Sequence, residues 1–465
     1  MTVAPLGLRR VQASLSLAFG ADSVCAQHPQ AIEKAVGEGT KVVGLSEMSP
    51  LGMGPVDTAI SWTNEPWNRK WFLDITRRLK RLKEKYKFKF VVGGPGAWQI
   101  YERTPETFLK SSPHLDQFAR EELGIDHVLE GEVDKIAPDI FQEIEDGSAP
   151  ECIRSYTNTI ASIESIPEIT EPTLTALVEC MRGCGRGCDF CAPNLRMKRD
   201  FPPERVAREA SINVKHGYGA TWLQSEEITL YGCENKDKWP NEDKILELYG
   251  ALKKVGVNKI GATHWTFAGV RAAPGLVKKL AELNNLRNGR DWMGVQPGLE
   301  FASPRLVKKF MPYKVKPFSP EEYPETVREG LRIMNANHYY PACTLIIGHP
   351  TEERDEVRMT INLIRTLSNE DRVHCIFAPL LFVDYCKPSQ TMDYDRMSEE
   401  HWELYHACWK HNVREFRENV WIATQSFGLP TRLVTILGTY AIGYYILGFL
   451  KSQFKKRYGR VPDWM

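Results

Sequence analysis

The chain lacks an excess of either charge. It carries 60 Lys and Arg residues against 59 Asp and Glu residues, a formal net charge of +1. A nucleic-acid surface held by bulk electrostatics needs a basic excess, so we expect no nucleic-acid partner. Tandem repeats and low-complexity tracts are also missing, and 42% hydrophobic residues indicate a folded globular protein.

Features of a secreted protein are missing as well. The N-terminal stretch "MTVAPLGLRRVQASLSLAFG" has no uninterrupted apolar core and no clear cleavage site, and the 11 cysteines are odd in number and spread along the chain. We therefore expect a reducing, cytoplasmic location. Clustered cysteines in such a protein are more often metal ligands or catalysts than disulfides.

The length of 465 residues predicts two domains with appendages. Residues 1–165 alternate strands and helices, with strands expected within 41–48 and 88–97 and at the start of 125–144. Such alternation predicts a Rossmann-like α/β domain with a parallel sheet, whose ligands lie beyond the carboxyl ends of the strands. The polar, Pro-containing segment 145–172 reads as a linker.

A second domain is expected over residues 166–395. Its six candidate strands predict a (β/α)6 partial barrel with the site at the carboxyl ends of the strands. These candidate strands are 175–180, 220–225, 259–267, 291–300, 340–350 and 373–383.

The sequence pattern of residues 396–465 predicts a C-terminal helical region. Within it, "LVTILGTYAIGYYILGFL" (433–450) has eighteen residues without a charge. As a helix it would be roughly 27 Å long, against a hydrocarbon core of about 30 Å. Two interpretations stay open: a helix buried against the barrel or at a dimer interface, or membrane association.

A cysteine cluster follows the first barrel strand. Cys184, Cys188 and Cys191 have the spacing C-x3-C-x2-C on a Gly-rich loop. One interpretation is a structural zinc site with Cys180 as the fourth ligand. The other is a [4Fe-4S] cluster held by three thiolates, with the fourth iron open. The irregularly spaced cysteines at 233, 343, 375, 386 and 408 are expected to be buried hydrophobic residues.

This loop resembles that of the radical S-adenosylmethionine (SAM) superfamily, where the open iron binds SAM and electron transfer cleaves SAM to a 5′-deoxyadenosyl radical. The motifs "TWLQSEEITLYG", "VQPGLEFASPRLVKKF" and "TLIIGHPTEERDEV" follow in the order typical of that family. Ser-Glu-Glu stands where Gly-Gly-Glu is commoner, and which Glu contacts the SAM amino group stays open. The resemblance implies SAM contacts from Phe190, Ser225, Glu226, Glu227, Gln296, Glu300, Ser303 and Gly348.

The N-terminal turns "GLSEMSPLGMG", "VVGGPGAW" and "GIDHVLEGEVD" resemble the cobalamin-binding domain that precedes many radical SAM methyltransferases, although an ordinary nucleotide-binding module has similar turns. The motif Asp-x-His-x-x-Gly is absent, so no histidine ligand to cobalt from that motif is expected. Cobalamin contacts are implied for Ser46, Ser49, Pro50, Leu51, Gly52, Gly93, Gly94, Pro95, Gly131 and Glu132.

Together these resemblances imply a cobalamin-dependent radical SAM C-methyltransferase. The deoxyadenosyl radical would abstract hydrogen from an unactivated sp3 carbon, methylcobalamin would donate the methyl group, and a ferredoxin or flavodoxin would supply electrons. The loop "SPLGMGPVD" most resembles methanogen-type members that modify methyl-coenzyme M reductase, which favours a glutamine of its alpha subunit as substrate. The alternatives are an enzyme acting on a lipid or tetrapyrrole at a membrane, and a non-catalytic cluster or cobalamin sensor.

Overall fold

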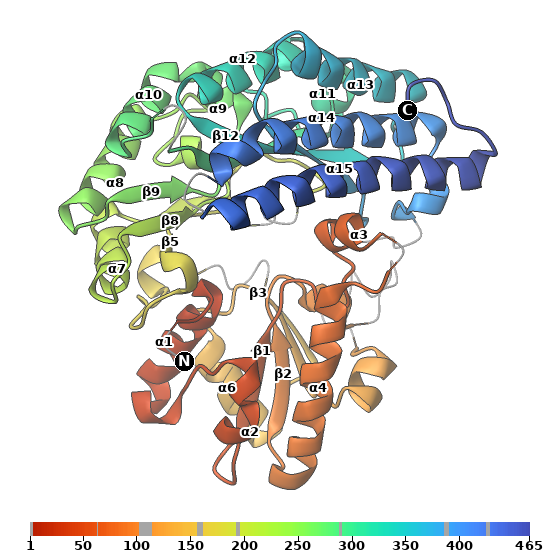
Figure 1. Ribbon diagram of the computed structural model, residues 1–465. Helices are drawn as coiled ribbons and strands as arrows, with labels where there is room; N and C mark the ends of the chain where they lie inside the picture. Colours follow the sequence, from red (N-terminus) through yellow and green to blue (C-terminus); the bar gives the residue numbers. More distant parts are fainter. Residues whose placement is uncertain are drawn as a thin grey trace.

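The computed structural model describes residues 3–62, 64–101, 114–155, 161–191, 196–287, 291–385, 390–424 and 428–465. The chain folds into an N-terminal α/β unit, a larger α/β barrel unit and two long C-terminal helices that lie along the barrel (Figure 1).

The N-terminal unit is built on a four-stranded parallel sheet in the order β1-β2-β3-β4. Alternate residues of the strands face opposite sides, so Phe90 and Val92 join one apolar cluster and Val91 and Leu129 join another. The main elements are α1 (Leu6–Phe19), α2 (Ile32–Ala35), β1 (Val42–Ser46), α3 (Pro55–Ser61), α4 (Trp67–Tyr86), β2 (Lys89–Gly93), β3 (His127–Gly131), α6 (Ala137–Asp146) and β4 (Cys152–Ser155).

The expectation that 145–172 is only a linker was wrong, because this segment contributes α6's last residues and the whole of β4. Cys152 to Ser155 pair with Val128 to Gly131 of β3 in parallel register. Four residues with two polar side chains give no strand pattern of their own, so the pairing with β3 decides their conformation.

The second unit confirms the expected six strand positions. β5 pairs with β8 and β8 with β9, while β10 to β13 form a further parallel sheet, and only Thr263 separates β9 from β10. The strands are β5 (Leu177–Glu179), β8 (Ala220–Gln224), β9 (Lys259–Ala262), β10 (His264–Trp265), β11 (Met293–Glu300), β12 (Tyr339–Ile347) and β13 (Ile376–Leu381).

Helices follow the barrel strands and cover their outer face. On β12, Cys343, Leu345 and Ile347 are buried, whereas the alternate residues Thr344 and Ile346 are partly exposed. One face of the strands is therefore packed and the other remains accessible, which leaves room for a ligand inside the partial barrel. The helices are α7 (Pro203–Lys215), α8 (Glu242–Lys254), α9 (Phe267–Ala272), α10 (Pro274–Leu283), α11 (Pro304–Phe310), α12 (Tyr323–Ala336) and α13 (Arg354–Asn369).

Two long helices, α14 (Glu399–Ala423) and α15 (Leu429–Tyr458), complete the chain. The Asn412 side chain of α14 accepts from the Phe377 N–H at 2.8 Å and donates to the Phe377 carbonyl at 2.7 Å, which fixes α14 on β13. The expected burial of the scattered cysteines is confirmed for Cys233, Cys343, Cys375 and Cys408, and Cys386 lies outside the described residues.

A buried arginine joins the two units. Arg182, which follows β5, donates to Glu179 at 2.7 Å, to Asp134 at 2.7 Å and to Glu132 at 3.1 Å. All four side chains are at most 10% exposed. Burial by itself would raise the pKa of Glu179, but Arg182 and Arg10 lower it to about 2. Glu132 and Asp134 follow β3, so the carboxyl end of the N-terminal sheet lies against the carboxyl end of β5.

Aromatic contacts join the units on another side. Trp62, which follows α3, stacks on Tyr394 with ring centroids 5.2 Å apart, and Trp98 meets Tyr385 edge to face at 4.9 Å. Trp62 follows the loop after β1 and Trp98 lies in the turn after β2, so loops from the carboxyl ends of three N-terminal strands reach the barrel unit (Figure 1).

We expect Arg182→Met to destabilise the protein by about 3–5 kcal/mol, because three buried carboxylates lose their shared cation. Arg208→Met is the matched control: Arg208 pairs with Glu168 at the surface with 60% of its side chain exposed, and its loss should cost about 1 kcal/mol or less. Thermal unfolding followed by circular dichroism measures both. Equal shifts in the two variants would contradict a structural role for Arg182.

Candidate active site

The cysteine loop lies between β6 (Met181–Arg182) and its antiparallel partner β7 (Arg199–Asp200). Gly183 has φ +70°, and a Cβ there would lie 2.4 Å from the Arg196 carbonyl oxygen, so only glycine allows the loop to turn this tightly. The turn brings Cys184 and Cys188 into the protein, with 9% and 7% of each residue exposed, while Cys191 is half-buried.

Burial raises the pKa of the Cys184 thiol and raises that of Cys188 to about 11. Both thiols are therefore protonated at neutral pH, and a metal that binds them must displace their protons. Among the described residues, no three His, Cys, Asp or Glu side chains are gathered in a metal-binding arrangement. The loop thus supplies three soft donors within eight positions, and cluster binding must draw them together.

Cys180 lies apart from this set. Its thiol is fully buried and donates to the Gln224 carbonyl oxygen at 3.5 Å, across the β5–β8 pair. This position disfavours the zinc interpretation, which required Cys180 as the fourth ligand.

Arg186, within the cysteine loop, is a buried residue that the sequence did not single out. Its guanidinium donates to the carbonyl oxygens of Tyr313 at 2.9 Å and Lys316 at 2.8 Å, and to the Thr266 hydroxyl at 3.0 Å. These bonds hold the loop against the segments that follow α11 and β10. An arginine in a Gly-rich loop gives no sequence signal for burial, since its partners are distant backbone carbonyls.

The acidic turn after β8 carries unsatisfied polar atoms. Within the described parts of the chain, Ser225 Oγ, Glu226 Oε2 and Glu227 Oε2 are buried and make no hydrogen bond. Buried polar atoms are normally paired, so three in succession indicate a polar ligand at this position. The turn also lies near the cysteine loop, because Arg186 Nη2 is 3.8 Å from Glu227 Oε2.

The two glutamates differ in what else they bind. Glu227 caps the short helix after it, with Oε1 accepting from the Thr229 N–H at 3.2 Å and from the Thr229 hydroxyl at 2.5 Å. Glu226 faces Arg196 at 3.6 Å, and burial raises its pKa to about 7 in spite of that arginine. Glu226 therefore keeps more unused capacity for a cationic ligand than Glu227 does.

Glu300 ends β11 in a left-handed conformation, with φ +61°. Its carboxylate accepts from Lys314 Nζ at 2.8 Å and from the Thr344 hydroxyl at 3.2 Å. Burial opposes the charge on Lys314, but the Glu300 carboxylate outweighs it and raises the Lys314 pKa. Lys314 was not anticipated, because it lies in an irregular segment whose approach to β11 is a tertiary contact.

The remaining residues expected to bind SAM lie in different settings. Gln296 projects from the middle of β11 and is exposed. Ser303 caps α11 and donates to Glu356 at 2.6 Å, so its hydroxyl is used inside the protein. Phe190 meets Phe301 edge to face at 6.1 Å, and Gly348 packs under Met392. Their roles in SAM binding stay predictions.

The loop after β1 is held by a side chain that the sequence did not indicate. Gln99, in the turn after β2, accepts from the Leu51 N–H at 2.8 Å and donates to Ser49 Oγ at 3.1 Å. Ser49 and Pro50 are buried and Leu51 is half-buried, whereas Ser46 and Pro95 are exposed at the carboxyl ends of β1 and β2.

Several glycines expected to approach cobalamin are needed by the protein itself. A Cβ on Gly94 would lie 2.6 Å from the Glu47 carbonyl oxygen, and one on Gly131 would lie 2.3 Å from that of Ser155. A Cβ on Gly52 would lie 2.4 Å from the Pro66 side chain. Gly93 differs, since a Cβ there would make only ordinary contacts with Leu129.

Glu132 also has an internal role, because it pairs with Arg182 and Arg199.

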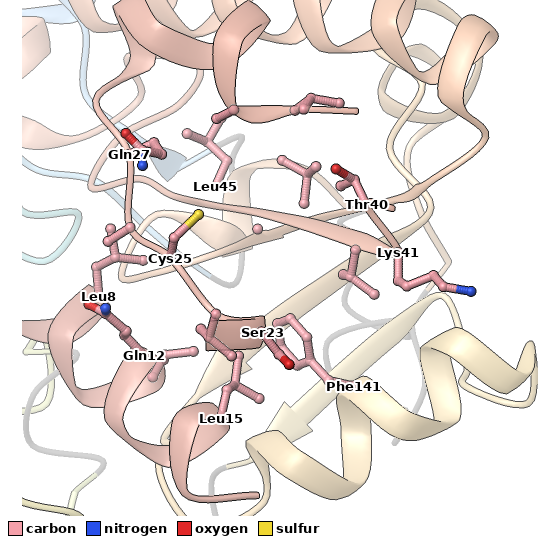
Figure 2. A pocket seen from close by; sticks show the side chains of 18 of the residues that line it. Leu8, Gln12, Leu15, Ser23, Cys25, Gln27, Thr40, Lys41, Leu45 and Phe141 are labelled. Carbon is pink, nitrogen blue, oxygen red and sulfur yellow. The ribbon is translucent and has the colours of Figure 1, made fainter. Parts of the chain in front are cut away.

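A cavity of about 750 Å³ lies elsewhere, along the outer edge of β1 (Figure 2). Its lining is mostly apolar and includes Leu8 and Leu15 of α1, Leu45 of β1 and Phe141 of α6. None of the residues expected to bind a cofactor lines it, so it is separate from the candidate site.

Comparisons with known proteins show which family the barrel unit is similar to. Residues 178–364 match the family model of the Radical SAM superfamily. Curated relatives include tRNA-2-methylthio-N(6)-dimethylallyladenosine synthases of Oceanobacillus iheyensis, 26% identical over 219 residues, and Bacillus subtilis, 24% over 220 residues. The match covers 47% of this chain and 39% or 40% of theirs, so the chain spans about two fifths of these relatives.

Solved structures match over more of the chain. The cobalamin-dependent radical SAM enzyme OxsB, with aqua-cobalamin and SAM bound, gives a TM-score of 0.58 at 12% identity and covers 100% of this chain and 75% of its own. The radical SAM methyltransferase TsrM from Kitasatospora setae, with cobalamin and a [4Fe-4S] cluster bound, gives 0.52 at 13% identity and covers 82% and 70%. Residues 178–364 are thus a radical SAM domain, within a chain that has the fold of these cobalamin-dependent enzymes.

Proposed function

We propose that the protein is a cobalamin-dependent radical SAM methyltransferase that transfers a methyl group to carbon. The observation that carries this proposal is the junction at Arg182, which sets the loop after β3 against the base of the cysteine loop. A two-cofactor methyl transfer needs this arrangement, because the radical generator and the methyl donor must reach the same substrate carbon.

The residues present fit a cluster and SAM. Cys184, Cys188 and Cys191 would hold three irons, and the unpartnered oxygens of Glu226 and Ser225 would accept from the SAM ammonium. The cations of Arg186 and Lys314 lie close to the thiol loop and offset part of the negative charge of three thiolates. With both groups bound, the site would supply a carbon-centred radical for hydrogen abstraction.

Cobalamin would bind over the carboxyl ends of β1, β2 and β3. Ser46 and Pro95 are exposed there, and Gly93 is half-buried between them. The Gln99 bonds fix the loop that would border the corrin. OxsB and TsrM, which share this fold, have cobalamin bound, and this supports the assignment.

For the substrate we favour a protein residue, a glutamine of the methyl-coenzyme M reductase alpha subunit, with a ferredoxin or flavodoxin as electron donor. This choice rests on the resemblance of the loop at 49–57. A lipid or tetrapyrrole substrate is the second candidate, and the exposed apolar face of α15 favours it. Incubation of reconstituted protein with SAM, cobalamin, reductant and each substrate class, followed by mass spectrometry for one added methyl group, tests both.

Cys188→Ala should abolish cluster binding, because a three-thiolate site loses one of its ligands. Cys180→Ala, a matched change four residues before Cys184, should retain the cluster. Iron content and visible absorption after anaerobic reconstitution measure binding, and release of 5′-deoxyadenosine with dithionite measures SAM cleavage. Retention of the cluster in Cys188→Ala would refute the assignment, and a wild type that releases no 5′-deoxyadenosine would indicate a sensor.

Glu226→Gln should weaken SAM binding and remove its pH dependence. The raised pKa of about 7 leaves Glu226 mostly protonated at pH 6 and mostly ionised at pH 8, so wild-type affinity should rise about tenfold across that range. Calorimetric titration of the reconstituted protein with SAM measures the affinity. If Glu227→Gln weakens SAM binding and Glu226→Gln does not, the amino group contacts Glu227 instead.

Gly93→Ala should weaken cobalamin binding without unfolding the protein, because the added Cβ makes only ordinary contacts with Leu129 but would stand between β2 and the bound corrin. Gly44→Ala is the control: Gly44 is also a strand glycine, and an added Cβ there would make an ordinary contact with Phe141 at 3.9 Å. Absorption of bound cobalamin after gel filtration distinguishes them. Equal cobalamin content in both variants would show that cobalamin does not bind over β2.

A further inference from the structure

The outward face of α15 is a large exposed apolar surface. Val434 and Leu437 are 69% and 70% exposed, and Tyr444 and Tyr445 are each 72% exposed. This helix is long and apolar enough to cross a membrane by length and composition, yet only 11% of its most apolar window is buried. The expectation of a helix buried against the barrel therefore holds for one face only, and soluble proteins rarely leave so continuous an apolar stripe uncovered.

The exposed and buried residues separate by helical position. Leu433, Leu437, Tyr440 and Tyr444 recur at intervals of three and four and share the outer face. Beside this face, a Cβ added to Gly443 would lie 2.7 Å from Val413 of α14, which shows how closely the two helices approach. The helix thus has one side in the protein and one side outside.

The C-terminal end of α15 is also fixed. Leu450 and Phe454 are fully buried, and the Tyr458 hydroxyl donates to the Met397 carbonyl oxygen at 2.8 Å. Beyond the helix, Arg460 pairs with Glu399 at the start of α14 at 2.6 Å. An isolated membrane-spanning helix would have lipid on every side, whereas this helix is docked on the protein at Gly443, Leu450 and Phe454 and can offer lipid only its outer face.

Basic residues lie at the edges of the apolar face. The outer stripe continues past Gly448 into Lys451 and Lys455, which have the same helical position, and Lys456 is beside them. Such a change from apolar to lysine along one face suits a surface with an apolar interior and anionic headgroups.

A second source of positive charge lies beside the stripe. Arg417 of α14 packs on the rings of Tyr440 and Tyr444, with its Cζ atom 5.2 and 4.6 Å from their centroids. In the described part of the chain its buried Nε and Nη2 atoms have no hydrogen-bond partner. Arg417 and Tyr440 line a pocket of about 570 Å³ between α13, α14 and α15, together with Arg365, Lys410, Arg414, Glu403 and Glu418. Its four cationic residues exceed its two acidic ones.

Helix α3 lies next to α15 (Figure 1) and adds exposed apolar residues. Trp62 meets Phe449 edge to face with ring centroids 4.8 Å apart, and α3 exposes 55% of Val56 and 69% of Ile60.

We propose that the outer face of α15 binds the surface of a membrane that contains anionic lipid, with the helix lying in the plane of the interface. The apolar stripe would enter the boundary between headgroups and acyl chains, while Lys451, Lys455 and Lys456 meet the phosphates. The charge pattern favours lipid over a second copy of this chain, because these lysines would have to find acidic partners on the same basic helix. This inference does not depend on the methyltransferase assignment.

Flotation with vesicles tests the proposal on the full-length protein. We expect wild type to float with vesicles of phosphatidylcholine and phosphatidylglycerol, and to float less with phosphatidylcholine alone or at high salt. The double variant Leu437→Glu, Tyr444→Glu should lower the bound fraction roughly tenfold or more, because two charges enter the apolar boundary. Leu17→Glu is the matched control, since Leu17 of α1 is 79% exposed and far along the chain from α15; it should bind like wild type.

Two further measurements keep the test decisive. Lys455→Glu with Lys456→Glu changes exposed side chains only, so it should fold and should lose the preference for anionic vesicles. Light scattering after gel filtration gives the oligomeric state. The proposal is overturned if wild type does not float, or if wild type is a dimer that Leu437→Glu, Tyr444→Glu converts to a monomer, which would assign the face to a second copy. Cluster content and SAM cleavage, measured separately, report on the methyltransferase assignment.

Discussion

The buried cation of Arg182 is the interaction on which the arrangement of this molecule depends. It lies between Glu179 of the barrel and Glu132 and Asp134 of the N-terminal unit. Two α/β units each place their loops at the carboxyl ends of parallel strands, but nothing in either unit alone makes those ends face each other. A guanidinium with five donors can satisfy three carboxylates at once, and the low exposure of all four groups makes separation of the units costly. The contacts of Trp62 and Trp98 then fix the orientation from other sides.

The candidate site combines satisfied and unsatisfied polar groups. Glu300 and Ser303 have their hydrogen bonds within the protein and act as supports, and Arg186 does so through its two terminal guanidinium nitrogens. Ser225, Glu226 and Glu227 keep buried oxygens without hydrogen-bond partners in the described part of the chain. This difference separates residues that build the scaffold from residues that are prepared for a ligand, and resemblance alone could not make that separation because all of them occur in the same motifs.

For α15, too, the structure distinguishes between interpretations that the sequence leaves open. Its sequence is equally consistent with a core helix and with a membrane helix, because both are apolar. The structure covers one face with α14 and leaves the other outside, near Trp62 at the end of α3. A membrane-facing helix that contacts the loop following α3 would bring the junction between the two units close to a lipid surface, which bears on how a lipid-borne substrate would reach the site.

The sequence by itself determined the positions of β1, β2 and β3, the six barrel positions and the cysteine loop, because hydrophobic periodicity, turn glycines and the C-x3-C-x2-C spacing are local features. It did not reveal β4, whose four residues become a strand only beside β3, nor the roles of Arg182, Arg186, Gln99 and Lys314. Their partners lie far away along the chain or are backbone atoms, which carry no sequence signal. The sequence also predicted that glycines such as Gly94 and Gly131 contact the cofactor. In the tertiary structure these glycines allow the protein's own backbone segments to approach each other. Only the folded chain decides which close approach a glycine permits, because that depends on what the neighbouring loops place opposite it.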